Sequence, residues 1–350
     1  MTPLLAAAGP ESGSAISTIA TPTMWGLTIA AVIALLALDF VLTRKPHEVS
    51  MKEAAGWSAF YIALPLAFGG WIWSQYGQQT GVEYLTGYLV EKSLSVDNLF
   101  VFMLLLTAFA VPAALQQRVL LWGIIGALVL RGIFIALGAA FLANFAFAFL
   151  VFGAILLATG VKILRDQVKG TGHDVDVANM RSVKLIRRFM PVTEDYRGPR
   201  MSVVENGKRM LTPFAVVVVA VFATDIVFAV DSVPAVYGIT GDPYLVFATN
   251  AFALLGLRAL YFVLQGALSK LVHLGYGLAA ILGFIGVKLV LHWAHGIWPG
   301  VPTVPTVWSL VVIVVILGVV TATSLYATRG RSGDAAESAH VAEPGAHQHR

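Results

Sequence analysis

The chain has 350 residues, of which 58% are hydrophobic and only 12% are charged, and its net charge is +4. A soluble domain carries about twice this share of charged residues, so the composition excludes a water-soluble protein. Cysteine is absent, which excludes disulfides and thiolate metal sites. Nothing in the placement of the basic residues indicates a nucleic-acid partner. We therefore expect an all-α, polytopic helical membrane protein that lies in a lipid bilayer.

Apolar segments long enough to cross a bilayer recur along most of the chain. We predict about nine spans, at residues 24–42, 57–74, 83–108, 118–141, 145–164, 212–237, 243–265, 275–295 and 305–327. The predicted organisation is therefore an N-terminal extracytoplasmic segment at 1–23, spans one to five at 24–164, a basic cytoplasmic loop at 165–211, spans six to nine at 212–327, and a disordered cytoplasmic tail at 328–350.

The loops between these spans alternate in charge. Lys and Arg gather in every second loop, most densely at 165–211, whereas "SQYGQQTGV", "YGITGDP" and "HGIWPGVPTVPT" contain none. The positive-inside rule then places the N-terminus outside the cell and the C-terminus in the cytoplasm. Within the basic loop, "MSVVENGKRML" has two strand-like runs around an Asn-Gly pair, which predicts a short hairpin.

Two of the predicted spans contain acidic residues in the same pattern. "EKSLSVDN" runs from Glu91 to Asp97, and "DIVFAVDS" runs from Asp225 to Asp231, so the two acids of each pair are six positions apart. A charged residue at the centre of a membrane helix costs about 2.5–3.5 kcal/mol on insertion scales. These acids are therefore expected to face a cavity, one another or a cation rather than lipid.

The similarity extends beyond the acids, in the same order. The next spans carry Arg131 and Arg258, and the spans after those contain "AILLATGVK" and "AILGFIGVK". We interpret residues 83–164 and 212–295 as two copies of a three-helix repeat. The loop charges give the copies opposite orientations, and inverted repeats with polar sites near the midplane are typical of transporters that work by alternating access.

Carboxylate, amide and hydroxyl oxygens near these acids form a ligand set for a hard cation such as Mg²⁺, Ca²⁺ or Mn²⁺. On an ideal helix Glu91, Ser95 and Asn98 share one face, and Asp97 points about 120° away from it. The acids therefore form two levels along a path, or the helices bend. The candidate metal ligands are Asp97, Asp231, Glu91, Asp225, Asn98 and Ser232.

The two arginines leave three interpretations open. Counted from the span ends, Arg131 lies level with Glu91, and Arg258 lies level with Asp225. Two ion pairs would then leave the second acid of each repeat as the central ligands. Alternatively, all four acids bind the cation directly, or every acid is paired and the charges are purely structural. Asp39, near the end of the first span, either joins the site or reaches the interface.

Several long motifs together resemble the TerC family of integral membrane proteins. They are "EKSLSVDNLFVF", "ATDIVFAVDSVPA", "MPVTEDYRG" with "ENGKRMLTPF", and the early "ALDFVLTRKPHEVSMKEAAGWSAFYIALPLAFG". The resemblance covers about residues 25–327. It implies a bacterial inner-membrane transporter that exports Mn²⁺, in a family linked to manganese excess and tellurium resistance. It also implies that the family's intramembrane acids correspond to Glu91, Asp97, Asp225 and Asp231.

We expect transport of a divalent metal ion by alternating access, with proton exchange at the buried carboxylates as a further hypothesis. The alternatives are transport of Ca²⁺ or another small solute, and a membrane scaffold in metal or tellurite stress whose acids are merely paired. We do not expect an enzyme or a resident cofactor, because the sequence has no nucleophile elbow, phosphate loop or zinc-protease motif. The oligomeric state is left open.

Overall fold

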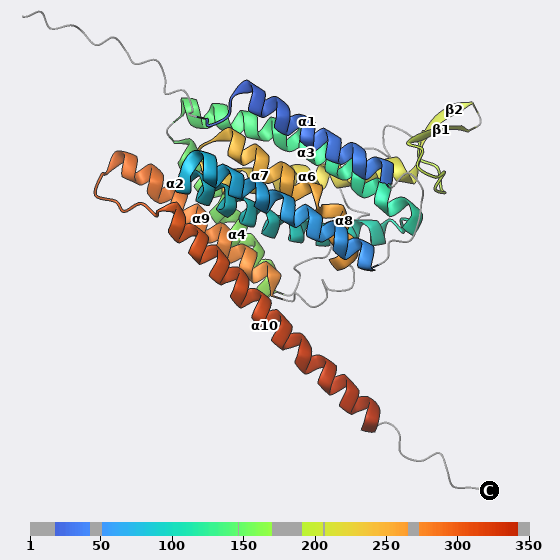
Figure 1. Ribbon diagram of the computed structural model, residues 1–350. Coiled ribbons are helices and arrows are strands. Elements are labelled where there is room, and N and C mark those ends of the chain that lie inside the picture. The colour runs from blue at the N-terminus through green and yellow to red at the C-terminus, as the bar shows by residue number, and fades with distance from the viewer. Residues whose placement is uncertain are drawn as a thin grey trace, which may run out of the picture.

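The computed structural model describes residues 18–42, 51–145, 147–169, 191–205, 207–264 and 273–341. Helices dominate this part of the chain, and Figure 1 shows them packed as a bundle from which the end of α10 projects. The helices are α1 Pro22–Leu42, α2 Met51–Ala108, α3 Ala113–Asn144, α4 Ala148–Val168, α6 Pro213–Tyr237, α7 Pro243–Leu255, α8 Leu257–Leu264, α9 Leu274–Ile297 and α10 Thr306–Val341.

Six helices within the described ranges are long and apolar enough to cross a membrane. The count is seven if α7 and α8 form one broken span. These two helices are bent by 41° relative to each other at Gly256. The sequence predicts two further spans within α2, whose second half is less apolar because it carries Glu91, Lys92 and Asp97.

The long helix α2 is a hairpin of two limbs rather than one straight rod. Gly77 interrupts it with φ 87° and ψ 175°, a conformation that residues with a Cβ avoid. The limbs pack against each other, since a Cβ at Gly69 would lie 2.9 Å from the Tyr84 ring and a Cβ at Gly81 would lie 2.7 Å from the Trp73 Cβ. The limbs lie where the sequence predicts the second and third spans.

Capping residues begin the helices that carry the site. Thr212 accepts a hydrogen bond from the Ala215 amide at 3.3 Å, and Pro213 occupies the first turn of α6. Asp242 caps α7 by accepting from the Tyr244 amide at 2.9 Å. The Asp242 carboxylate also accepts from the Thr18 hydroxyl at 2.7 Å, so the start of the described chain is held against the start of α7.

The Gly77 turn lies at this same end of the bundle. Gln79 follows the turn, Thr240 precedes α7, and both line one cavity. We call this the Gly77 end.

A small sheet precedes α6 at the opposite end. Strands β1 (Ser202–Glu205) and β2 (Lys208–Leu211) pair in antiparallel register, with Ser202 opposite Leu211. This is the position at which the Asn-Gly pair predicts a hairpin. Residues 170–190 of the basic loop lie outside the described residues.

Helix α10 differs from the sequence prediction. The polar tail at 328–350 was expected to be disordered, but α10 continues to Val341, and only 342–350 lie outside the described residues. The tail sequence "DAAESAH" contains three Ala and one Glu, which have high helix propensity, although Gly330 and Gly333 before it do not. Because the preceding apolar span already supplies the helix nucleus, extension costs less than a new start would.

Helices α4 and α9 cross at glycines. A Cβ at Gly153 would lie 2.9 Å from the Gly286 carbonyl oxygen, and a Cβ at Gly286 would lie 3.0 Å from the Gly153 carbonyl oxygen. Further along, a Cβ at Gly160 would lie 3.1 Å from the Ala279 carbonyl oxygen. The backbones therefore approach closely, as at the small-residue interfaces of membrane helices.

Candidate functional site

A buried guanidinium lies at the centre of the bundle. Arg131 on α3 is 1% exposed. Its Nη1 donates to the Glu91 carboxylate on α2 and, at 2.8 Å, to the Asn250 side-chain oxygen on α7. Its Nη2 lies 3.6 Å from the Asp225 carboxylate on α6. Four helices therefore contribute polar groups to one point.

Two further candidate residues belong to this cluster. With its amide oriented to satisfy both ends, Asn98 accepts from Arg131 Nη2 at 3.0 Å and donates to the Leu94 carbonyl at 3.1 Å. Asp231, which is half-buried on α6, interacts electrostatically with Arg131. The cluster of Glu91, Asn98, Arg131, Asp225, Asp231 and Asn250 is called the Arg131 site below.

Carboxylates outnumber guanidinium groups at this point. Glu91 and Asp225 both lie at the Arg131 guanidinium, and Asp231 interacts with it electrostatically. Three or more His, Asp or Glu side chains do not converge in metal-binding geometry anywhere in the described residues.

Several buried polar atoms on the four helices that form the Arg131 site lack a hydrogen-bond partner among the described residues. Native proteins pair most buried polar atoms, and each exception calls for a physical explanation. These atoms are Glu91 Oε2, Ser95 Oγ, Arg131 Nε, both Asp225 carboxylate oxygens, Ser232 Oγ and Asn250 Nδ2. Five of these seven atoms are oxygens, which are the atoms a hard cation or water would bind.

The predicted site residues have different outcomes. The pairing of Arg131 with Glu91 is confirmed, and Asn98 and Asp225 lie at the same guanidinium. Ser232 is buried on α6. The side chain of Asp97 lies outside the described residues, so its predicted role as a central ligand stays a prediction. Asn250 was missed, because a single amide in an apolar span gives no periodic signal.

The predicted pairing of Arg258 with Asp225 is wrong. Arg258 on α8 instead forms a buried ion pair with Asp39 on α1. The bend at Gly256 is the physical reason, because counting positions from a span end assumes a straight helix. Asp39 is therefore buried beside Arg258 rather than placed at the interface.

Lys92 on α2 lies inside the bundle, close to the break between α7 and α8. Its ammonium group donates to the Ala253 carbonyl at 3.4 Å. A broken helix leaves carbonyls without their usual amide partners, and Lys92 supplies a donor for one of them.

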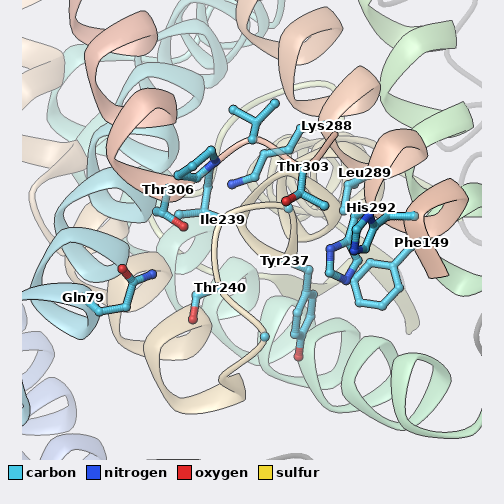
Figure 2. A pocket seen from close by; sticks show the side chains of 15 residues that line it. Gln79, Phe149, Tyr237, Ile239, Thr240, Lys288, Leu289, His292, Thr303 and Thr306 are labelled. Atoms are coloured by element: carbon cyan, nitrogen blue, oxygen red, sulfur yellow. The ribbon is translucent and has the colours of Figure 1, made fainter. Parts of the chain in front are cut away.

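A polar cavity of about 540 Å³ opens at the Gly77 end. Gln79 from α2, Thr240 from the loop before α7 and Lys288 from α9 converge around it, as Figure 2 shows. His292 lies on its wall with its ring packed against Phe149 at 4.7 Å between centroids. The cavity is thus lined by groups that hydrogen-bond water.

The comparisons with known proteins agree on one family. A sequence model described as the integral membrane protein TerC family matches residues 76–332. An uncharacterized membrane protein of Myxococcus xanthus is 46% identical over 274 residues, covering 78% of this chain and 85% of the relative. Another, from Mycobacterium tuberculosis, is 44% identical over 277 residues, covering 79% of this chain and 70% of the relative.

A third relative, Alx of Escherichia coli K12, is described as a candidate membrane-bound redox modulator. It is 40% identical over 286 residues, which cover 79% of this chain and 88% of the relative. No solved structure matches the chain.

Proposed function

Because the chain belongs to the TerC family of integral membrane proteins, we propose that it is a transporter of a divalent cation, with Mn²⁺ as its cargo. The observation that carries this proposal is the gathering of buried carboxylate and amide groups at the Arg131 site, where Glu91 and Asp225 share one guanidinium. In this proposal Asp231 and Asp97 complete the carboxylate set.

The ligand chemistry supports a hard cation. Carboxylate, amide and hydroxyl oxygens bind Mn²⁺, Mg²⁺ and Ca²⁺, and Asn98 and Ser232 supply the neutral oxygens. Arg131 would hold the carboxylates together when the metal is absent, and the metal would compete with it for them.

We propose nine spans with an inverted repeat as the architecture of transport. The α2 hairpin supplies two antiparallel limbs, which raises the span count from seven to nine. The α4–α9 contact also supports the repeat. Aligning "AILLATGVK" with "AILGFIGVK" matches Gly153 with Ala279 and Gly160 with Gly286. A two-fold axis that exchanges the two copies would convert the contact of Gly153 with Gly286 into a contact of Gly160 with Ala279. Both contacts are present.

Orientation and location follow the loop charges. In this proposal the protein lies in a bacterial inner membrane, with the Gly77 end and the N-terminus outside and α10 ending in the cytoplasm. Alternating access would open the Arg131 site first to the cytoplasm and then to the cavity at the Gly77 end. Export against a concentration gradient needs an energy source, and proton exchange is the one we propose.

Three other functions are alternatives to be tested. The first is transport of Ca²⁺ or another small solute, and the second is a scaffold role in metal or tellurite stress. The third follows the name of Alx and is modulation of cellular redox state. A chain without cysteine cannot perform thiol–disulfide exchange itself, so this role would act through a metal or a partner. We do not propose an enzymatic activity.

Reconstitution into liposomes tests the transport proposal. We expect saturable uptake of radioactive Mn²⁺ by the wild-type protein, and we expect Asp225→Asn to lower it by about 10–100-fold or more, since loss of a metal-site group has effects of that size. Glu205→Gln is the matched control, because Glu205 pairs with Arg197 outside the spans. Wild-type vesicles that take up Mn²⁺ no faster than protein-free ones would contradict the proposal, and competition by Ca²⁺ tests selectivity.

A further inference from the structure

The wall of the polar cavity at the Gly77 end is basic. Lys288, His292 and His295 on α9 are spaced four and three residues apart, so they share one helical face, and all three line the cavity. The residues that line it include no Asp and no Glu. The cavity therefore offers a positive charge and hydrogen-bonding groups, but no carboxylate that would hold a cation.

The Lys288 ammonium group points its donors into this space. Figure 2 shows it reaching between Thr303, from the loop after α9, and Thr306, the first residue of α10. The side chains of these three residues form no hydrogen bond with the described part of the chain. An ammonium group has three N–H donors, and a hydroxyl group has one donor. Donors from α9, α10 and the loop between them therefore converge where no protein acceptor meets them.

Glu83 on α2 does not take up these donors. It interacts electrostatically with Lys288, but it is not among the residues that line the cavity, and no hydrogen bond joins the two side chains in the described structure. The Glu83 carboxylate accepts from the Thr240 hydroxyl at 2.7 Å and from the Gln79 amide at 2.8 Å. Glu83 therefore fixes two polar groups of the wall and leaves the Lys288 donors to a group inside the cavity.

The two imidazoles contribute to the wall in different ways. The His295 ring is held by a 2.6 Å hydrogen bond between its Nδ1 and the Val301 carbonyl oxygen. The His292 ring packs against Phe149 and forms no hydrogen bond with the described residues. A neutral imidazole has one N–H donor, and a protonated one has two. His292 can therefore donate into the cavity one helical turn away from Lys288.

Donors arranged in this way suit an anion with several oxygens. The oxygens of a phosphate group point in different directions, so donors from separate elements can bind them at the same time. Lysine is a common phosphate-binding residue because its point charge strengthens such hydrogen bonds. The cavity volume of about 540 Å³ leaves room for a phosphate group together with water, whose share of liquid volume is about 30 Å³ per molecule.

Two tryptophans place this cavity at the level of lipid headgroups. Trp298 and Trp308 precede and follow the stretch that contains Thr303 and Thr306, and their side chains are 60% and 61% exposed. Exposed tryptophans in a membrane protein mark the interface between the bilayer and water. The phosphate of a phospholipid headgroup and inorganic phosphate in solution can therefore both reach the cavity.

We propose that this cavity binds a phosphate group, with Lys288 as its charged ligand and His292, Thr303 and Thr306 as hydrogen-bond donors. The site is separate from the Arg131 site, and it goes beyond the proposed function because binding there does not depend on the cargo. In the proposed transport cycle, the bound phosphate would place negative charge in the cavity through which the cation leaves.

Calorimetric titration of the full-length protein with inorganic phosphate tests the site. The protein is in detergent without metal, phosphorus analysis shows that phospholipid has been removed, and chloride at equal ionic strength is the reference. We expect saturable binding to wild type. Lys288→Met should lower the affinity by about tenfold or more, because it removes charge-assisted hydrogen bonds. Thr306→Val, which keeps the side-chain shape, should lower it by about two- to tenfold, and it replaces Lys288→Met if that variant does not fold.

Lys162→Met is the matched control. Lys162 occupies the same place in the "GVK" of the other repeat copy, but its side chain is exposed and does not line the cavity. This variant should bind phosphate as wild type does. An equal loss of affinity in Lys162→Met and Lys288→Met would overturn the site, because it would show a general effect of charge.

Phospholipid nanodiscs distinguish the two sources of the phosphate group. Binding of inorganic phosphate that persists in nanodiscs supports free phosphate as the ligand. Binding that is present in detergent and absent in nanodiscs supports a lipid headgroup that already occupies the site. No binding to the folded wild type in detergent, or equal affinity in wild type and the folded cavity variants, would overturn the phosphate site. These results leave the transport proposal standing, since uptake of Mn²⁺ tests it separately.

Discussion

The bundle buries two arginines, and their surroundings differ. Arg131 contacts or interacts with carboxylates from α2 and α6 and amides from α2 and α7, so several negative charges share one positive charge. Arg258 is paired with one carboxylate of the described residues, that of Asp39. A balanced pair needs no further charge, whereas an excess of carboxylates attracts a cation. The difference indicates that the two buried arginines have different tasks.

Substitution of each buried arginine is expected to have the largest effect on stability. It also tests whether the surroundings of Arg131 and Arg258 differ in their response to a metal. Arg131→Met and Arg258→Met should each destabilise the protein by about 3–5 kcal/mol, because each leaves a buried carboxylate uncompensated. Mn²⁺ at about 100 times its Kd would restore about 2.7 kcal/mol to a variant that binds it. We expect the Mn²⁺-dependent rise in melting temperature to be larger in Arg131→Met than in wild type, since the competing guanidinium is gone, and unchanged in Arg258→Met.

A double variant supplies the control for this experiment. Asp39→Leu with Arg258→Met replaces a buried pair by apolar side chains, which is often neutral or stabilising. Its stability should therefore approach that of wild type, and its Mn²⁺ response should match wild type. An Mn²⁺ response in Arg131→Met no larger than that of wild type would contradict the different tasks of the two arginines.

Substitutions at the α4–α9 contact should have a smaller effect. Gly286→Ala would place a Cβ 3.0 Å from the Gly153 carbonyl and 2.9 Å from Leu157, which should cost about 1–3 kcal/mol of stability as overpacking does. Gly283→Ala on the same helix meets nothing within 4 Å and should be neutral or stabilising, because alanine favours helix. Melting temperatures of the purified variants measure both. Equal effects would contradict the close contact, and with it the support that this contact gives to the repeat.

The sequence allowed part of the site to be predicted, and the reasons are physical. The pairing of Arg131 with Glu91 could be predicted because both residues lie on unbroken helical segments. In such a segment the number of residues from the end of the span gives the depth of a residue in the membrane. Arg258 follows a glycine at which α7 and α8 bend by 41°, so the same counting fails.

The fold was predictable to a similar extent. Apolar length located the helices, and the Asn-Gly pair located the strands β1 and β2. The Gly77 turn, which makes α2 a hairpin, depends on a positive φ that composition alone does not specify. Helix α10 continues past its apolar span to Val341, although the extension contains Gly330 and Gly333, because elongation of an existing helix avoids the cost of nucleation.

Calorimetric binding of Mn²⁺ to the purified protein tests the central claim most directly, since that claim is that the carboxylates around Arg131 hold a divalent cation. We predict saturable binding to wild type and to the loop variant Glu205→Gln, and a loss of affinity of about 10–100-fold or more in Glu91→Gln and Asp225→Asn. Binding of equal affinity in all four proteins, or no binding to the folded wild type, would contradict the account.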